Sequence, residues 1–203
     1  MTLEGKNIYD VAQIDAKTSY KITTALIVPR PIGWIGTRSA DGVTNLAPYS
    51  FFNAVAASPP TFVIGPSNTG RRDTLDNILA TKEFTVNVVS ERTVEAMNRS
   101  AGSFPAGESE FEICDLQEVA AETVDAPLVG EAIANFECRC IQTVDLGDNT
   151  LVIGEATRIH VASRLIDDEG HNVIQEDVNA IGRHAGGLYS RTATTLFSLD
   201  RPD

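Results

Sequence analysis

Residues 29–52 read PRPIGWIGTRSADGVTNLAPYSFF, and this stretch decides the fold. Its first part, Ile32 to Thr37, is rich in strand-forming residues and runs into an Asp41-Gly42 pair, a strong short-range signal for a β-hairpin. The next part, Val43 to Ala57, alternates loosely between apolar and polar residues until a Ser58-Pro59-Pro60 turn closes it. The stretch therefore predicts consecutive β-strands joined by tight connections.

The rest of the chain adds further strands and only short helices. Two β-rich segments, Ala134 to Val144 and Thr150 to Val161, flank a turn and predict an antiparallel pair. Shorter segments predict strands at 61–64 and 84–89, helices at about 73–80, 92–98 and from about Asp177, and a loop at 100–109. Asp73 is the expected N-cap of the first of these helices. Since no repeat or linker interrupts residues 1–203, we expect one mainly β domain, a β-barrel or sandwich with helical decoration.

Alternation along the segment from Ala134 divides its side chains between two faces. Phe136, Cys138 and Cys140 are expected on one face, and Glu137 and Arg139 on the other. The chain's three cysteines cannot all pair with one another, and their spacing fits neither a disulfide framework nor a paired CxxC zinc site. We expect the Cys138/Cys140 pair to be small, reduced core residues, with a metal site or a strained link as the alternatives.

The composition excludes several classes of function. The 203 residues include 28 Asp and Glu against 16 Lys and Arg, a formal charge of -12. Affinity for nucleic acids and for anionic membranes comes largely from Lys and Arg, so we expect no nucleic-acid and no membrane partner. The beginning of the chain shows no basic region followed by an apolar run, and no apolar run is long enough to span a bilayer. We therefore expect a soluble, cytoplasmic protein.

Common catalytic motifs are absent from the sequence. Residues 65–72 have the glycine spacing of a phosphate-binding P-loop, but Arg71 and Arg72 replace the Lys and Ser/Thr which that loop requires. There is no G-x-G-x-x-G after a strand, no H-E-x-x-H and no G-x-S-x-G. The histidines are too scattered to predict a metal site, and the acidic turn at 167–170 lacks the ligand spacing of a calcium loop. P-loop hydrolysis, zinc proteolysis and α/β-hydrolase chemistry therefore lose support.

The first third of the chain carries the candidate site. The segments 29–37 and 45–52 supply an aromatic and apolar wall, and Arg71 and Arg72 precede a helix N-terminus, where backbone N–H groups favour an anion. Together they suit a flat, largely apolar ligand with a phosphate tail. A simpler interpretation stays open, in which Asp73 only caps its helix, the arginines are solvated, and the segment 45–52 is a half-buried strand with a proline bulge.

These motifs also resemble a known family. The sequence quoted above, followed by a Pro-Pro turn, an apolar strand ending in Gly-Pro and the segments RRDTLDNI and EFTVNVV, resembles the flavin reductase-like family of FMN-binding split barrels. The resemblance implies an antiparallel split β-barrel, a homodimer and FMN at or near the subunit interface. It places these residues beside the flavin ring and ribityl chain: Thr37, Asn45, Ala47, Pro48, Tyr49 and Ser50. It places these residues at the phosphate end: Ser67, Arg72, Asp73 and Thr74.

The C-terminal segment 183–191 also resembles the family's terminal motif. The resemblance implies that a glycine-rich turn and an aromatic residue, Tyr189, approach the flavin. His184 is the one candidate for a catalytic residue that tunes protonation. The alternative for His184 and Tyr189 is a structural turn with a packed aromatic side chain. A nicotinamide dinucleotide is anionic, so the acidic chain also needs a local positive patch, for which Arg30, Arg183 and Arg191 are candidates.

The resemblance implies an oxidoreductase that passes hydride from NADH or NADPH through FMN to a flavin, oxygen, a partner or a small acceptor. In such an enzyme the flavin carries the chemistry, and the protein supplies position and electrostatics. One alternative is an FMN-containing electron carrier of the flavoredoxin type. Another is a flavin-binding protein without turnover.

Overall fold

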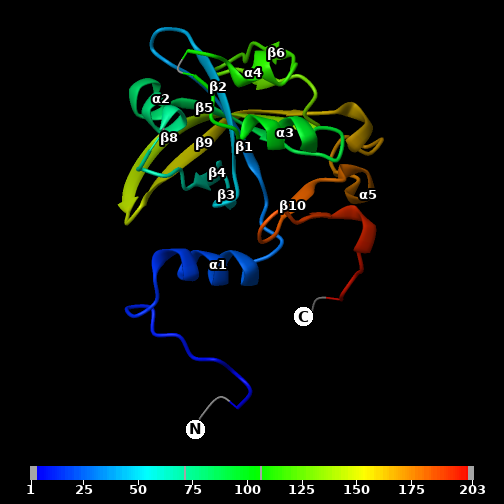
Figure 1. Cartoon of the computed structure of the whole chain (residues 1–203). Helices are drawn as coiled ribbons and strands as arrows, with labels where there is room; N and C mark the ends of the chain where they lie inside the picture. The colour runs from blue at the N-terminus through cyan, green and yellow to red at the C-terminus, as the bar shows by residue number, and fades with distance from the viewer. Residues whose placement is uncertain (1–3, 71, 106, 201–203) are drawn as a thin grey trace.

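The computed structural model describes residues 4–70, 72–105 and 107–200, and an antiparallel sheet dominates it (Figure 1). The seven strands run in the order β2-β1-β5-β8-β9-β4-β3, and every neighbouring pair is antiparallel. Their bounds are β1 Gly33–Arg38, β2 Thr44–Tyr49, β3 Phe52–Ala57, β4 Pro60–Ile64, β5 Glu83–Val88, β8 Ala134–Leu146 and β9 Asn149–Val161. The predicted mainly β class is confirmed.

The chain itself brings the two edges of this sheet together. The edge strands β2 and β3 are consecutive, and only Ser50 and Phe51 separate Tyr49 at the end of β2 from Phe52 at the start of β3. A sheet whose first and last strands meet at one corner must curl strongly, and the ribbon in Figure 1 is curved in this way. The result is a barrel that is split between β2 and β3, with the Ser50-Phe51 corner at the split.

Strand β1 separates two hydrophobic cores. Ile35 is fully buried inside the barrel, in a cluster with Leu75 and Ile78 of helix α2 (Asp73–Thr81). Trp34 points to the other face, in a cluster that includes Met97 of α3 (Val94–Ser100) and Phe111 of α4 (Glu110–Ile113). Because β1 is covered on both faces, its residues from Gly33 to Thr37 are all buried and show no alternation between buried and exposed positions.

The hairpin between β1 and β2 forms as the Asp41-Gly42 signal predicts. The Ser39 N–H donates to the Val43 carbonyl at 2.9 Å, and Gly42 has a φ of +88°, a conformation that glycine adopts without strain. The expected cap of α2 is wrong. Arg72 occupies the N-cap position, no side chain caps the helix there, and Asp73 is its first helical residue.

The predicted alternation along β8 is confirmed as far as Cys140. Phe136, Cys138 and Cys140 face the barrel core, and Glu137 and Arg139 both contact Thr123 on the other face. Bulges interrupt the pairing of β8 with β9 between Glu137 and Cys138 and again between Cys140 and Gln142. At the first irregularity the extra residue is Thr157 of β9, so the faces of β8 are unchanged there, and Glu137 and Cys138 are both fully buried because both faces of β8 are covered. Cys138 lies in the barrel core, as expected, with Cys140 packed against that cluster, and all three cysteines are free.

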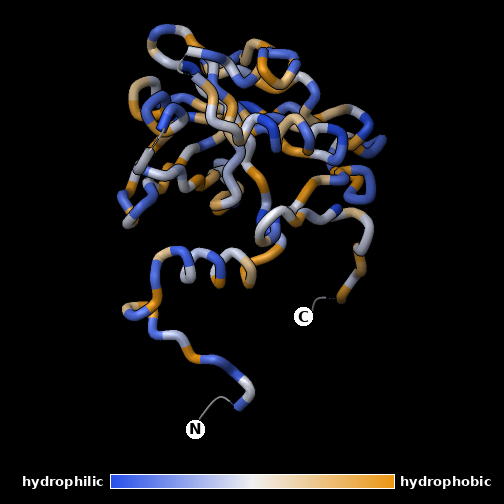
Figure 2. Tube along the Cα trace, in the orientation of Figure 1, coloured by the Kyte–Doolittle hydropathy of each residue, from blue (hydrophilic) through white to orange (hydrophobic). Residues whose placement is uncertain are grey.

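Further elements lie outside the barrel near both ends of the chain and between β5 and β8. Helix α1 (Ala16–Leu26) was not predicted, and it lies outside the barrel in Figure 1. Figure 2 shows apolar residues along it, of which Leu26 is exposed. Asp15 caps it by accepting the Thr18 N–H at 2.9 Å. The remaining elements are β6 Glu118–Val119, β7 Leu128–Val129, η1 Ser163–Leu165, α5 Gln175–Val178, β10 Ile181–Arg183, β11 Tyr189–Arg191 and η2 Ala193–Thr195. The helix expected from about Asp177 corresponds to α5. Among the described residues, no helix has the length and hydropathy of a membrane span.

Candidate functional site

Two adjoining hollows form a groove along the outer edge strand β2. The first, of about 270 Å³, lies between β2, the beginning of α2, the segment after α3 and α4. The second, of about 210 Å³, continues past the end of β2 toward α1 and the β10-β11 hairpin. They share Pro48, Tyr49 and Ala101, so they form one continuous surface. The predicted residues that line it are Asn45, Ala47, Pro48, Tyr49, Ser50, Asp73, Thr74 and Tyr189.

A network of neutral side chains holds the floor of the groove. Thr37 is completely buried, and its hydroxyl accepts hydrogen bonds from Asn77 Nδ2 at 3.0 Å and from Asn45 Nδ2 at 3.4 Å. Asn45 Nδ2 also donates to Thr74 Oγ1 at 2.9 Å. Thr37 therefore lies beneath the groove and not in its lining, where it links β1 and β2 to α2.

The N-terminus of α2 gives the first hollow a site for an anion. The Asp76 N–H is the first to bond within the helix, to the Arg72 carbonyl at 2.8 Å, so the amides at 73–75 precede the helical hydrogen-bond pattern. Without a side-chain cap, such amides and the helix dipole favour a negatively charged ligand. Thr74 is buried at this end and lines the same hollow.

The other predicted phosphate residues do not line either hollow. Ser67 is exposed, and its hydroxyl lies 3.0 Å from that of Thr69. The Arg72 guanidinium donates to Asp76 Oδ1 at 2.7 Å and to the Asn68 carbonyl at 3.4 Å. Arg71 lies outside the described residues. Both Ser67 and Arg72 belong to the loop that leads into α2, next to the helix end but turned toward partners of their own.

Two acidic side chains and a tyrosine adjoin the hollow at α2. Glu110 is buried, and its Oε2 accepts the backbone N–H of Leu46 at 2.9 Å, which fixes α4 against β2. Asp73 lies across the hollow from it at the start of α2. Burial raises the pKa of Tyr49, and the nearby charges of Asp73 and Glu110 raise it further, so Tyr49 stays a neutral hydrogen-bonding group.

The C-terminal hairpin closes the second hollow. The Tyr189 hydroxyl donates to Asn98 Oδ1 at 3.1 Å, and the Arg183 guanidinium lies 4.5 Å from the centre of the Tyr189 ring. The His184 ring is 3.0 Å from the Ser190 hydroxyl, and His184 is not among the residues that line the groove. Of the three arginines expected to form a positive patch, only Arg183 lines it, because Arg191 pairs with Glu91 and Arg30 is buried.

Arg30 joins three separate segments at the split corner. Its guanidinium donates to the carbonyls of Thr24 and Ile27 at the end of α1, with the Ile27 bond at 3.0 Å. It also donates to Ser50 Oγ and to the His184 carbonyl, both at 3.3 Å. The end of α1, the end of β2 and the C-terminal hairpin are thereby held at fixed positions around Ser50.

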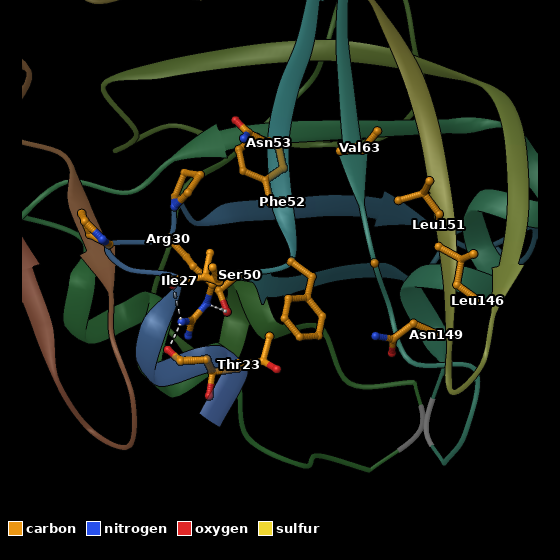
Figure 3. A pocket seen from close by; sticks show the side chains of 15 residues that line it. Thr23, Ile27, Arg30, Ser50, Phe52, Asn53, Val63, Leu146, Asn149 and Leu151 are labelled. Carbon is orange, nitrogen blue, oxygen red and sulfur yellow. Dashed lines mark hydrogen bonds between the residues drawn. The ribbon is translucent and has the colours of Figure 1, made fainter. Parts of the chain in front are cut away.

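A larger, mostly apolar cavity of about 540 Å³ lies on the other side of this corner. Figure 3 shows it between α1 and the barrel, with the Arg30 guanidinium and Ser50 at one side and Leu146, Asn149 and Leu151 at the other. Ser50 lines both this cavity and the second hollow of the groove. The Ser50-Phe51 corner therefore separates two concave surfaces.

Sequence reasoning missed the wall of the groove that follows α3. Ser100, Ala101, Gly102 and Ser103 line the first hollow, but their sequence indicates only a loop. Ser100 is held there because its Oγ accepts the indole N–H of Trp34 at 2.9 Å, and its own hydroxyl donates to the Met97 carbonyl at 2.8 Å. This contact joins positions that are distant in sequence, and no local pattern signals it.

Comparisons with known proteins agree with this geometry. The model of the family described as "Flavin reductase like domain" matches residues 25–191. The chain belongs to this family. Its match covers every strand of the barrel and every residue that lines the groove except Tyr20. The structure of a putative flavin reductase with a split barrel domain from Shewanella frigidimarina superposes with a TM-score of 0.82 at 22% identity, covering 94% and 96% of the two chains, and confirms the expected split-barrel fold.

Individual relatives extend the match over nearly the whole chain. An uncharacterized protein of Aquifex aeolicus is 42% identical over 182 residues, which cover 88% of this chain and 92% of the relative. The structure of nitrilotriacetate monooxygenase component B from Bacillus cereus superposes with a TM-score of 0.91 at 33% identity, covering 96% and 98% of the two chains. That of 2-nitrobenzoate 2-nitroreductase NbaA from Pseudomonas fluorescens gives 0.89 at 30% identity, covering 97% and 96%. Membership of this flavin reductase family supports flavin binding and a flavin-related oxidoreductase or flavoprotein.

Proposed function

We propose that the chain is an FMN-dependent oxidoreductase that accepts hydride from NADH or NADPH and passes electrons to a second acceptor. The observation that supports this most directly is the groove itself. It runs from the uncapped N-terminus of α2, past the Pro48-Tyr49 wall, to Tyr189 in the C-terminal hairpin. A polar, anion-binding end that continues into an apolar and aromatic surface matches a phosphate joined to a flat ring.

The residues at the groove fit FMN by their chemistry. Thr74 and the first-turn amides of α2 would hold the phosphate, beside Asp73. Ser67 and Arg72 would add donors from the loop that precedes the helix, once Arg72 turns from Asp76. The ring and ribityl chain would lie along a surface formed by Asn45, Ala47, Pro48, Tyr49, Ser50 and Tyr189, with Thr37 as a support from beneath.

The bound flavin would supply the hydride-accepting ring, and the protein would position and shield it. Tyr49 is neutral and half-buried, so it can donate a hydrogen bond without adding charge. Arg183 is the positive charge beside the second hollow, where an anionic nicotinamide dinucleotide would approach. His184 stays a candidate for tuning protonation through the hairpin that carries Tyr189.

The names of the two similar structures support two candidate classes of electron acceptor. One is named as a component of a monooxygenase and the other as a nitroreductase. By analogy, this protein would deliver electrons either to a partner oxygenase, as reduced flavin, or directly to a small nitroaromatic compound. An electron carrier that does not use nicotinamide stays the main alternative.

A homodimer is part of this proposal. The cavity in Figure 3 is apolar, and large exposed apolar residues surround it, among them Ile27 at 63% exposure, Phe51 at 41% and Leu146 at 53%. Exposed apolar patches of this kind mark interaction surfaces. Sedimentation equilibrium should give twice the monomer mass of 21.8 kDa.

The decisive experiment is an absorption spectrum of the FMN-loaded protein before and after anaerobic addition of NADH and then NADPH. We expect a flavin spectrum that bleaches within seconds with the preferred donor. A spectrum that persists with both donors but bleaches with dithionite indicates the electron carrier instead. A protein that binds no added FMN contradicts the proposed site.

A matched pair of variants tests whether FMN occupies the groove. Thr74→Val removes a hydroxyl from the groove. The control, Thr61→Val, removes a hydroxyl on strand β4, outside the groove, that donates to the Pro59 carbonyl at 3.0 Å. We expect the FMN Kd to rise about tenfold in Thr74→Val, because one hydrogen bond to a charged group is lost. The Kd should stay unchanged in Thr61→Val. Equal affinities in the two variants would contradict phosphate binding at Thr74.

A further inference from the structure

A third cavity, separate from the groove, lies where β5 and β9 end and β8 begins. It has a volume of about 380 Å³ and shares no lining residue with the two hollows of the groove. Its polar lining consists of Ser90, Arg92, Gln117, Glu131 and Arg164. Apart from Glu131, these side chains carry hydrogen-bond donors, in a protein whose net charge is -12.

Ser90 is the buried residue of this set. It is 5% exposed, and within the described ranges its hydroxyl is the buried side-chain polar atom that has no hydrogen-bond partner. Its backbone is already engaged, because the Ser90 N–H donates to Thr93 Oγ1 at 3.1 Å and its carbonyl accepts the Thr93 N–H at 3.0 Å. An unpaired buried hydroxyl costs free energy, so a ligand that accepts its hydrogen bond gains that energy back.

The two arginines at the cavity are not engaged by an acidic side chain of the described residues. Five of the ten arginines of the described residues pair with a carboxylate, for example Arg38 with Glu118 and Arg158 with Glu122. Among these same residues, neither Arg92 nor Arg164 has such a pair, and Arg164 makes only a 3.4 Å bond to the Asp177 carbonyl. Both are exposed, so their guanidinium groups can reach a ligand at the mouth of the cavity.

The one carboxylate in the lining is directed elsewhere. Both oxygens of Glu131 accept the backbone N–H of Gln117, at 3.1 and 3.2 Å. The Gln117 side chain lies against Gly130, whose missing Cβ leaves the space for it. The lining therefore keeps a net positive charge, with donors from two guanidinium groups, an amide and a hydroxyl.

We propose that this cavity binds the phosphate group of a small molecule, with Ser90 as the buried donor and Arg92 and Arg164 as the charged ones. A tetrahedral phosphate offers acceptors in more directions than a planar carboxylate does, which suits donors that come from separate segments. The site is independent of the proposed flavin function, because it shares no residue with the groove.

The test uses the full chain with saturating FMN, so that any phosphate site in the groove is already occupied. Inorganic phosphate is titrated against chloride at constant ionic strength, and binding is followed by calorimetry and by backbone amide NMR shifts. We expect a saturable isotherm, with shifts confined to 90–92, 117, 130–133 and 162–164. Acetate should bind at least tenfold more weakly, and equal binding of acetate and phosphate would overturn the assignment to phosphate.

Variants locate the site. Ser90→Ala should weaken phosphate binding about tenfold, the loss expected for a hydrogen bond to a charged group. The double variant Arg92→Gln/Arg164→Gln should abolish the saturable isotherm, and both residues are exposed, so the fold should persist. Arg139→Gln removes an exposed arginine of β8 outside the cavity and should leave the affinity within twofold. A linear titration, or unchanged affinity in the double variant, would overturn the proposal.

Discussion

Two groups of polar side chains are buried in this molecule, and both are satisfied by hydrogen bonds. One contains only neutral side chains, whereas the other surrounds a carboxylate. Beneath the groove, Thr37, Asn45 and Asn77 are buried and joined by hydrogen bonds between neutral groups. On β8, three strands away from β2 in the sheet, the carboxylate of Glu137 is also completely buried. It accepts hydrogen bonds from the Glu122 N–H at 2.9 Å, from the Thr123 N–H at 2.6 Å and from its hydroxyl, and it lies 2.7 Å from His160 Nε2.

The difference shows what each centre stabilises. A buried carboxylate persists only if several donors replace its water, so Glu137 fixes the segment around 122–123 firmly to the barrel. The neutral network contains weaker bonds, but none of its members changes charge with pH. The floor of the proposed flavin site is therefore insensitive to pH, whereas the attachment of the 122–123 segment is not.

The largest expected effect is the loss of the carboxylate. Glu137→Gln keeps the size of the side chain but directs an amide N–H₂ toward the Thr123 and Glu122 donors. We expect the free energy of unfolding in denaturant to fall by about 3–5 kcal/mol. Glu155→Gln on β9 changes a partly exposed carboxylate and should cost at most about 0.5 kcal/mol. Similar losses of unfolding free energy in both variants would show that Glu137 does not stabilise the attachment of the 122–123 segment.

The second effect is the pH dependence of that loss. The hydrogen bonds from Glu122, Thr123 and His160 lower the pKa of Glu137 from its ordinary value of 4.5 to about 2, although burial alone raises it. Because the pKa of Glu137 is lower in the folded than in the unfolded chain, its ionised carboxylate stabilises the fold fully above pH 4.5. This stabilisation declines as the pH falls toward 2, by about 3 kcal/mol of unfolding free energy in all. Wild type and Glu137→Gln should therefore differ most at pH 7 and converge near pH 2–3. A difference that stays constant between pH 7 and pH 3 would contradict the shift.

This centre also shows where prediction from the sequence ends. The hairpin at Asp41-Gly42 and helix α2 depend on local turn chemistry and periodicity, and both were predicted. Glu137 does share a face with Arg139 as expected, but its complete burial depends on the distant segment at 122–123 that covers this face, and no local pattern signals that contact. The groove likewise combines residues that the sequence predicted with residues that it did not. The lining from Asn45 to Ser50 was predicted by resemblance, but the wall at 100–103 depends on the contact between Trp34 and Ser100 across the fold.

The third effect lies in the neutral network. Thr37→Val replaces the hydroxyl with a methyl group of similar size and leaves the amides of Asn77 and Asn45 without their shared acceptor. We expect a loss of about 1–3 kcal/mol in unfolding free energy, with no change between pH 4 and pH 8. Because Asn45 also holds Thr74, FMN affinity should fall as well. Intact FMN binding with reduced stability would show that the network supports the fold alone.

The smallest effect on stability, and the sharpest test of the groove, comes from the ion pair between Arg72 and Asp76 on α2. The pair is 2.7 Å long but partly exposed, so removing it should cost at most about 0.5 kcal/mol whichever partner is replaced. FMN affinity should separate the two partners. Arg72→Gln removes a donor from the proposed phosphate end and should raise the FMN Kd about tenfold. Asp76→Asn frees Arg72 and removes a negative charge from the first turn, so it should leave the Kd unchanged or lower it. If the two variants change the Kd equally, Arg72 remains a partner of Asp76, and the phosphate is bound by the helix end and Thr74 without it.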